Sequence, residues 1–173
     1  MFAAHRPTGS KREIYDELAR QARGLFDGER DAIANAANLS ALLFGGLTDV
    51  NWAGFYFLKG DELVLGPFQG KPACVRIALG KGVCGTAMER RQTLVVPDVD
   101  KFPGHIPCDA DSRSEIVVPL IAGGRAMGVL DIDSPIPARF DDDDRDGLEA
   151  LAALWLRASE LSDLSLHVAA AAR

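Results

Sequence analysis

Two aspartates, Asp131 and Asp133, flank Ile132 in an apolar run that is typical of a β-strand. Because side chains alternate between the two faces of a strand, both carboxyl groups should lie on one face and Ile132 on the other. Neighbouring carboxylates are costly to bury without a partner, so this pair should share a proton, hold a cation or lie on a solvated face. The pattern by itself favours the plainest of these interpretations, a solvated strand end.

Three cysteines, Cys74, Cys84 and Cys108, form the second group that could do chemistry. Each one alone could be a small buried apolar residue, but their clustering weakens that explanation. An odd number of cysteines, with no export signal visible in the sequence, argues against a structural disulfide framework. A zinc site built from the three cysteines and His105 would lack the close ligand spacing of structural zinc sites, so we expect no bound metal.

Cys108 lies in a long segment rich in Pro, Gly and Asp, close to His105 and Arg113. Cationic neighbours would lower the pKa of the Cys108 thiol, whereas Asp109 and Asp111 would raise it. The local charges therefore leave the reactivity of this cysteine open.

Two other motifs have structural explanations. The run Asp141–Asp144 after Phe140 is typical of a helix N-terminus, where acidic side chains cap the backbone and interact favourably with the helix dipole. The segment Gly80–Thr86 lacks the spacing and the Lys-Ser/Thr ending of a phosphate-binding loop. Its glycines should instead serve a tight turn from a strand into a helix.

Hydrophobic periodicity predicts the elements that must position these residues. Apolar residues at helical spacing predict helices over 11–26, 33–43, 83–91 and from about Phe140 to about Leu166. Alternating, β-branched or aromatic residues predict strands over 50–58, at Leu63 and Leu65 up to Gly66-Pro67, and over 74–79, 94–96, 116–121 and 127–133. Hairpin connections predominate, so we expect an α+β fold with a mainly antiparallel central sheet. Two N-terminal helices and one C-terminal helix should pack on that sheet.

The whole chain has the composition of a globular protein, with 173 residues of which 47% are hydrophobic and 25% charged. We expect one compact domain over 11–166, between a flexible N-terminus over 1–10 and a C-terminal tail over 167–173. A net charge of −6 and the lack of a long basic run disfavour binding to nucleic acid. The sequence has no apolar segment of membrane length and no signal peptide, so we expect a cytoplasmic protein that does not associate with membranes.

Several longer motifs together resemble one family. They are NWAGFYFL, LGPFQGKPACVRIALGKGVCGTA, PDVDKFPGHIPCDADSRSEIVVPL and GVLDIDSP, followed by FDDDDRDGLEALA. Over about residues 12–160 they resemble the free methionine-R-sulfoxide reductases, small single-domain enzymes of the GAF fold. Ordinary GAF sensor domains share the LDIDS-like strand and the start of the last helix, but not the three cysteines in these contexts.

The resemblance implies an enzyme that reduces the R epimer of free methionine sulfoxide, with thioredoxin as the electron donor and no cofactor. By motif match, Cys108 is the catalytic nucleophile, and Cys74 is the cysteine that resolves its sulfenic acid into a disulfide. Cys84 matches a further cysteine near the substrate that can assist recycling. Trp52 and Tyr56 match aromatic positions that wall the pocket.

The same resemblance assigns Glu115, Asp131 and Asp133 to an acidic cluster in the pocket. Cleavage of the S–O bond needs a proton on the departing oxygen, and a carboxyl that burial keeps protonated can supply it. The other acidic groups can bind the ammonium group of the substrate. Trp52 can offer an apolar face to the S-methyl group.

Two other classes of function remain open from the sequence. A GAF-type binding or redox-sensing module would hold a small molecule in the same pocket without catalysis, since one fold hosts many functions. A scaffold protein has only the long last helix in its favour, and that helix is equally compatible with a homodimer.

Overall fold

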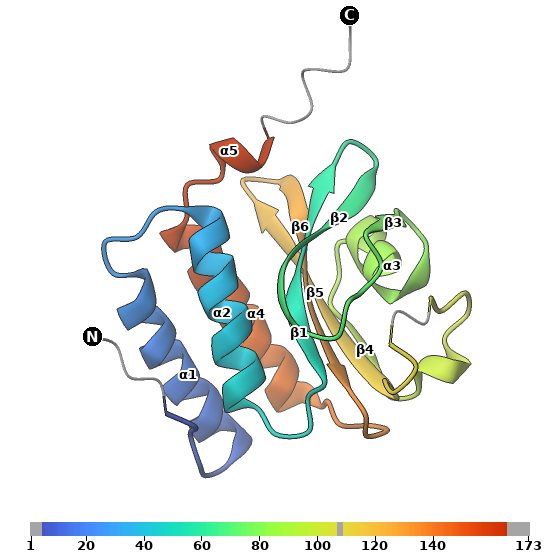
Figure 1. Ribbon diagram of the computed structural model, residues 1–173, viewed down its shortest axis with the longest axis horizontal. Helices are drawn as coiled ribbons and strands as arrows, with labels where there is room; N and C mark the ends of the chain where they lie inside the picture. The colour runs from blue at the N-terminus through green and yellow to red at the C-terminus, as the bar shows by residue number, and fades with distance from the viewer. Residues whose placement is uncertain (1–4, 107–108, 166–173) are drawn as a thin grey trace, which may run out of the picture.

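The computed structural model describes residues 5–106 and 109–165, and it shows a central antiparallel sheet of six strands with helices on both faces (Figure 1). The strand order is β3-β2-β1-β6-β5-β4. The strands are β1 (Trp52–Lys59), β2 (Glu62–Gly70), β3 (Arg76–Ala78), β4 (Leu94–Val96), β5 (Ser114–Ala122) and β6 (Arg125–Ser134). The helices are α1 (Lys11–Phe26), α2 (Ala32–Gly46), α3 (Gly82–Arg90), α4 (Asp142–Ala158) and α5 (Ser162–Ser165), with a 3-10 turn η1 (Val99–Lys101). The predicted α+β class and antiparallel sheet are confirmed.

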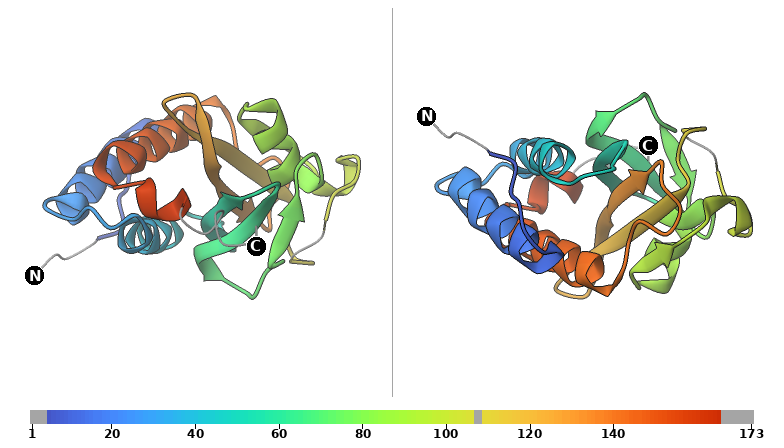
Figure 2. Two further views of the ribbon diagram at one scale, coloured as in Figure 1. Left: turned by 90° about the horizontal axis from the view of Figure 1, so that it is seen from above. Right: turned by 90° about the horizontal axis from the view of Figure 1, so that it is seen from below.

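Helices α2 and α4 pack directly on one face of the sheet, and α1 packs against both of them (Figure 2). Helix α1 begins at a capping box, in which the side chains of Ser10 and Glu13 accept hydrogen bonds from each other's backbone N–H groups. It lies close to α4 because Gly147 has no Cβ, which would stand 2.1 Å from the ring of Tyr15. The apolar core of this face includes Leu18, Leu39, Leu43, Phe55, Leu130, Ile132 and Trp155.

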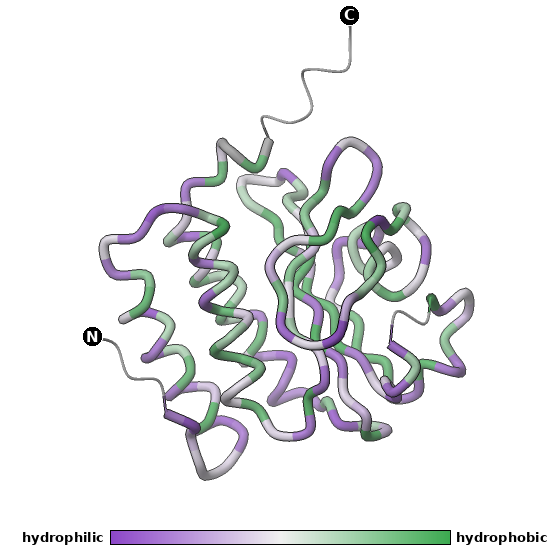
Figure 3. Tube along the Cα trace, in the orientation of Figure 1, coloured by the Kyte–Doolittle hydropathy of each residue, from purple (hydrophilic) through white to green (hydrophobic). Residues whose placement is uncertain are grey.

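The opposite face of the sheet carries α3 and the loop that joins β4 to β5 (Figure 2). The turn into α3 uses left-handed backbone at Gly80 (φ 74°) and Gly82 (φ 58°), as the glycine spacing predicts. A second apolar cluster lies here, and it contains Trp52, Tyr56, Leu63, Cys84, Met88, Val117 and Val129. Figure 3 shows hydrophobic residues along the central strands and hydrophilic residues in the connecting loops.

Strand β2 runs through Gly66-Pro67 to Gly70, so the predicted end at Gly66-Pro67 is wrong. The register against β1 shifts between Gly54 and Tyr56, which places both residues of the dipeptide opposite Phe55. This is a β-bulge, and a proline is tolerated at a bulge because no ladder hydrogen bond is needed from it.

Two further element boundaries differ from the prediction. Strand β3 covers only Arg76–Ala78, because only those residues pair with β2, so Cys74 lies in the preceding loop and not in a strand. Helix α4 ends at Ala158, and the backbone N–H of Glu160 donates to the carbonyl of Arg30 at 2.7 Å. That contact turns the chain away from the helix axis before the short α5, so the predicted end near Leu166, which lies outside the described residues, is wrong.

The acidic run at 141–144 caps α4, as predicted. The Asp141 side chain accepts from the backbone N–H of Asp144, whose own side chain accepts from that of Asp141. The buried Asp144 carboxylate also accepts from the Tyr15 hydroxyl at 2.9 Å and pairs with Arg139 at 3.0 Å. These contacts show that the run has a structural role. In the part of the chain that the structure describes, no helix is long and apolar enough to span a membrane.

Candidate active site

Strands β1, β5 and β6 bring the candidate residues together on the sheet face that carries α3. Asp131 and Asp133 on β6 line a cavity on this face, whereas Ile132 is buried in the helical core, as the strand alternation predicts. In the sheet register, Asp133 pairs with Glu115 of β5 on one side and with Trp52 of β1 on the other. The register therefore places a third carboxyl group and an aromatic ring beside the two aspartates.

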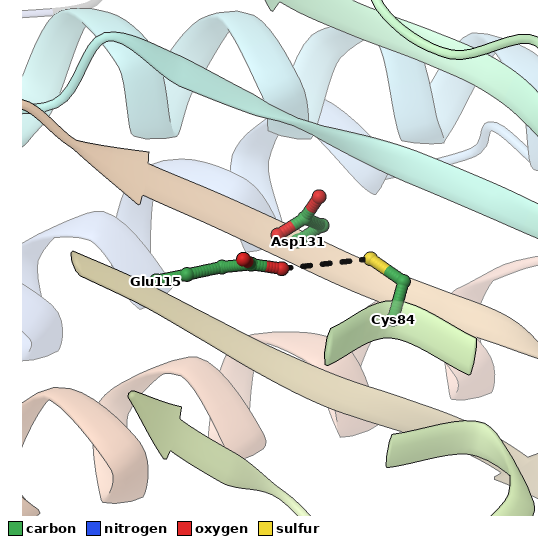
Figure 4. Close-up of side chains that lie close together, drawn as sticks. All are labelled: Cys84, Glu115 and Asp131. Carbon is green, nitrogen blue, oxygen red and sulfur yellow. Dashed lines mark hydrogen bonds between the residues drawn. The ribbon is translucent and has the colours of Figure 1, made fainter. Parts of the chain in front are cut away.

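Cys84 of α3 lies over two of these carboxyl groups. Figure 4 shows the side chains of Cys84, Glu115 and Asp131 converging from α3, β5 and β6. The Cys84 thiol donates to Glu115 Oε1 with an S···O distance of 3.8 Å, and one ligand atom from each residue lies within 4.8 Å of the others. Asp131 is only 6% exposed, so the solvated strand end that the sequence pattern favours does not apply to it.

Burial raises the pKa of every acidic group in this cluster. It raises the pKa of Asp131 to about 7, and the pKa of Glu115 well above its ordinary value with the charges of Asp131 and Asp133 adding to the effect. The pKa of Asp133 is raised first by burial and then by the charges of Asp131 and Asp109. The pKa of the Cys84 thiol is also raised, mainly by burial. The cluster therefore keeps protons that an exposed group of acids would lose at neutral pH.

Three stacked aromatic rings form an aromatic wall on the same face of the sheet, and one of them, Tyr56, lines the cavity described below. Trp52 stacks on Phe68 with ring centroids 5.3 Å apart and on Tyr56 at 5.8 Å. Gly54 makes room for this stack, since a Cβ there would stand 2.4 Å from the Cβ of Phe68 and 2.7 Å from the Trp52 ring. The Tyr56 hydroxyl donates to the carbonyl oxygen of Cys74 at 3.0 Å, which ties this wall to the loop before β3.

The cavity between these groups is small, about 30 Å³. It is lined by Tyr56, Ile77, Gly82, Val83, Cys84, His105, Ile106, Asp109, Ser112, Glu115, Asp131 and Asp133. A larger cavity of about 600 Å³ lies near Ile33, Phe57 and Leu164 on the helical side of the molecule. We place the candidate site in the smaller cavity because several titratable groups with perturbed pKa values converge there.

The three cysteines differ in their surroundings. Cys84 is a free and buried thiol, and Cys74 is half-buried in the loop between β2 and β3, where it has a partner of its own. Cys108, the expected nucleophile, lies outside the described residues. The catalytic roles expected for the three cysteines therefore stay predictions, as do the binding roles of Trp52, Tyr56 and the three acidic residues.

Sequence reasoning missed two polar residues beside the acidic cluster. Ser112 lines the cavity, and Asn51 donates through Nδ2 to Ser112 Oγ and to Asp109 Oδ2, both at 3.1 Å. From the sequence, Asp109 matters only through its effect on the pKa of the Cys108 thiol, whereas in the structure its side chain also lines the cavity. Its position directly after Cys108, the expected nucleophile, is the sequence feature that could have identified it as a site residue.

Cys84, Glu115 and Asp131 are also the group of described residues whose ligand atoms are close enough to surround a cation. Their hydrogen bond and their raised pKa values also fit a cluster that shares protons. The expectation of a site without metal or cofactor stays a prediction.

Comparison with known proteins shows the same fold and close relatives. The family model described as "GAF domain" matches residues 10–155. The free methionine-R-sulfoxide reductase of Escherichia coli is 56% identical over 144 residues, covering 83% of this chain and 87% of that protein. A crystal structure of a putative GAF sensor protein from Burkholderia vietnamiensis is 64% identical with a TM-score of 0.85, covering 87% of this chain and 96% of that one.

The free methionine-R-sulfoxide reductase of Neisseria meningitidis, solved in complex with its substrate, has a TM-score of 0.88. It is 45% identical and covers 91% of this chain and 95% of that chain. These matches extend over nearly the whole domain and agree with the motif resemblance. The chain therefore belongs to the GAF-domain family and, within it, to the free methionine-R-sulfoxide reductases, which are oxidoreductases.

Proposed function

We propose that this protein reduces free L-methionine (R)-S-oxide to methionine through thiol chemistry. The observation that carries the proposal is the cluster of buried Glu115 and Asp131 with half-buried Asp133, which pairs with Trp52 in the sheet, in a member of this family. A pocket with excess acid suits an amino acid with a free ammonium group, and an aromatic wall suits its S-methyl group. A peptide-bound methionine sulfoxide lacks that ammonium group.

The reaction begins when the Cys108 thiolate attacks the sulfur of the sulfoxide. This attack forms a bond between Cys108 Sγ and the substrate sulfur, and a carboxyl group of the cluster donates a proton to the sulfoxide oxygen. The protonated oxygen passes to Cys108 Sγ as the S–O bond breaks, and the bond between the two sulfur atoms breaks with its electron pair remaining on the substrate sulfur. Methionine leaves with both electrons of the reduction, and Cys108 is oxidised to a sulfenic acid. The raised pKa values of Glu115, Asp131 and Asp133 support this role, because a donor must carry its proton at neutral pH.

The Cys74 thiol then attacks the sulfenic acid, which releases water and forms a Cys74–Cys108 disulfide. Thioredoxin reduces that disulfide with two electrons from its own dithiol and becomes oxidised itself. Cys84 is the accessory thiol in this scheme. Its burial raises its pKa, so it is a poorer nucleophile than an exposed cysteine. We also propose a cytoplasmic location, where thioredoxin keeps thiols reduced, and a homodimer.

The substrate claim is tested by thioredoxin-coupled oxidation of NADPH with the separated epimers of free methionine sulfoxide. We expect turnover with the free R epimer and little with the S epimer or with peptide-bound methionine sulfoxide. Equal activity on a blocked or peptidyl substrate would contradict the specificity for the free amino acid. Saturable binding of the R epimer without turnover would favour a binding or sensing module.

The roles of the thiols are tested by single-turnover experiments with the reduced enzyme. Cys108→Ser should release no methionine, whereas Cys74→Ser should release one methionine per enzyme and then stall or slow. Mass spectrometry of unreduced peptides should show a disulfide to Cys108, mainly from Cys74, after one equivalent of substrate. A burst of methionine from Cys108→Ser would transfer the role of nucleophile to another cysteine.

A further inference from the structure

Asp109 connects three separate segments around the candidate site. Its side chain is 6% exposed and lines the cavity. It accepts hydrogen bonds from Asn51 Nδ2 at 3.1 Å, from Lys71 Nζ at 3.3 Å and from the backbone N–H of Asp111 at 2.9 Å. The Asp109 carboxylate thus contacts Asn51, the residue before β1, and Lys71, at the start of the loop between β2 and β3. It also contacts the backbone of its own loop.

The Lys71 contact reaches the segment that carries the expected resolving cysteine, Cys74. Lys71 precedes Cys74 by three positions, and its ammonium group also pairs with Asp111. The backbone on both sides of this segment is fixed to the aromatic wall, since the Trp52 Nε1–H donates to the carbonyl of Lys71 at 3.1 Å and the Tyr56 hydroxyl to that of Cys74. The contact of Lys71 with Asp109 thus joins the segment after Cys108 to a loop whose backbone is already held on the sheet.

The Asn51 contact fixes the other side of the network to the sheet. The backbone N–H of Asn51 donates to the carbonyl of Asp133 at 3.1 Å, and its side chain also donates to Ser112 Oγ. Asp109 directly follows Cys108 in the sequence, so these contacts hold the segment that begins right after the expected nucleophile. The segment after Cys108 is thus held to β6, the strand that carries Asp131 and Asp133.

We propose that Asp109 is a positioning residue, which holds the segment after Cys108 against the segment before Cys74 so that the sulfenic acid and the resolving thiol meet rapidly. This inference rests on the proposed function and assigns to Asp109 a role in the second chemical step. Asp109 does not itself touch the reacting sulfur atoms in this role. It acts through Lys71 and Asn51.

The charge of Asp109 has a second effect on the site. Hydrogen bonding, first from the backbone N–H of Asp111, lowers the pKa of Asp109 and keeps it ionised. Its charge in turn helps to raise the pKa of Asp133, which also faces Asp131 on its own strand and Glu115 on β5, while a Ser112 hydrogen bond acts in the opposite direction. Removal of the Asp109 charge should therefore lower the pKa at which the cluster loses its protons.

The strengths of these contacts predict how strongly different variants should slow disulfide formation. The Lys71 side chain is 60% exposed, and an exposed ion pair contributes little and weakens with salt. The hydrogen bond from Asn51 is partly buried and holds the carboxylate more firmly. Lys71→Met should thus have a smaller effect than Asp109→Asn, and Asp109→Ala should have the largest.

The experiment separates the two chemical steps in the full-length reduced enzyme. Rapid quenching with mass spectrometry follows methionine release and formation of the Cys74–Cys108 disulfide after one equivalent of the free R epimer. In Asp109→Asn we expect a normal amount of methionine released per enzyme, and disulfide formation slowed about 10- to 100-fold, as for a misplaced reacting group. The alkaline limb of the kcat/KM profile should also move to lower pH.

Asp98→Asn is the matched control. Asp98 lies in the same loop and pairs with Lys101, but it is outside the cavity, so both readouts should stay at wild-type values. Thermal unfolding of each variant checks the fold, and Lys71→Met serves if Asp109→Ala does not fold. Wild-type rates of disulfide formation and an unmoved alkaline limb in Asp109→Asn would overturn the inference while leaving the proposed function intact. The lack of any methionine burst from the wild type would instead refute the proposed function.

Discussion

At the residue scale, Asp131 and Asp133 have different surroundings although they share a face of β6. Asp131 is buried against Cys84 and Glu115, and its Oδ1 atom has no hydrogen-bond partner among the described residues. Asp133 is more accessible and lies next to Ser112 and Asp109 in the cavity wall. Burying a carboxyl oxygen without a hydrogen-bond partner costs free energy of folding. The presence of Asp131 at this buried position therefore fits a role in chemistry.

We expect Asp131→Asn and Asp133→Asn each to lower kcat/KM by about 10² to 10⁴-fold, the usual effect of losing an acid or base group. Each amide keeps the size of the side chain but can neither give up a proton nor carry the charge that attracts an ammonium group. The assay is thioredoxin-coupled turnover of the free R epimer. Asp61→Asn, in the exposed turn between β1 and β2, is the control and should be unaffected. Near-normal kcat/KM in both site variants would show that the pair has no catalytic part.

At the element scale, each helix and strand limits the position of a site residue. Helix α3 carries Cys84 over the sheet because left-handed glycines allow the chain to turn sharply after β3. Helix α4 lies on the opposite face, and its N-terminus is fixed by the Asp141–Asp144 capping box. The two faces of the sheet are therefore stabilised by different contacts. A substitution at the N-terminus of α4 can thus change the stability of the fold without touching the candidate site.

We expect Asp141→Ala to lower the free energy of unfolding by about 1 kcal/mol, because an N-cap hydrogen bond is lost at the start of α4. The pair of Asp141 with Lys11, at 2.7 Å, is partly exposed and should add little. Urea unfolding measures the change. Asp142→Ala removes a neighbouring carboxylate that is 86% exposed and caps nothing, so it should alter stability much less. Equal losses in the two variants would show that general charge, and not the cap, stabilises the helix. Both should retain wild-type activity.

At the scale of the whole molecule, the acidic cluster lowers the stability of the fold while it supplies the groups that the proposed reaction needs. The sheet is covered by an apolar core on the helical face, whereas the α3 face combines apolar residues with buried acidic groups. A carboxyl whose pKa is raised on folding is protonated more readily in the folded state than in the unfolded state. Such a group destabilises the fold increasingly as the pH rises from its unfolded pKa to its folded pKa.

The pKa of Asp131, about 7, places this loss of stability between about pH 4 and about pH 7. We expect Asp131→Asn, which cannot ionise, to gain free energy of unfolding relative to the wild type as the pH rises through that window. Urea unfolding at about pH 5 and about pH 8 measures the difference. Groups with lowered pKa values, such as Asp98 and Asp141, contribute equally to both proteins. A difference that does not change with pH, as expected for the Asp61→Asn control, would contradict a raised pKa in the fold.

The sequence by itself determined the features that depend on short spacing. Helical periodicity located α1, α2 and α3, and the alternation in β6 placed Asp131 and Asp133 on one face and Ile132 on the other. The cap of α4 was likewise readable, because a capping box involves residues only three positions apart. The motifs around the three cysteines also indicated the family, because each motif is a continuous stretch of sequence.

Only the tertiary structure decided the features that depend on contacts between distant residues. Strand register brought Glu115 beside Asp133, and the bulge opposite Phe55 carried β2 through a proline. The contact of Glu160 with Arg30 ended α4, and the contacts of Asp109 with Asn51 and Lys71 joined three segments. Burial, and with it the raised pKa values, follows from how the layers pack. Local spacing encodes no such packing, because each of these contacts depends on residues far away along the chain.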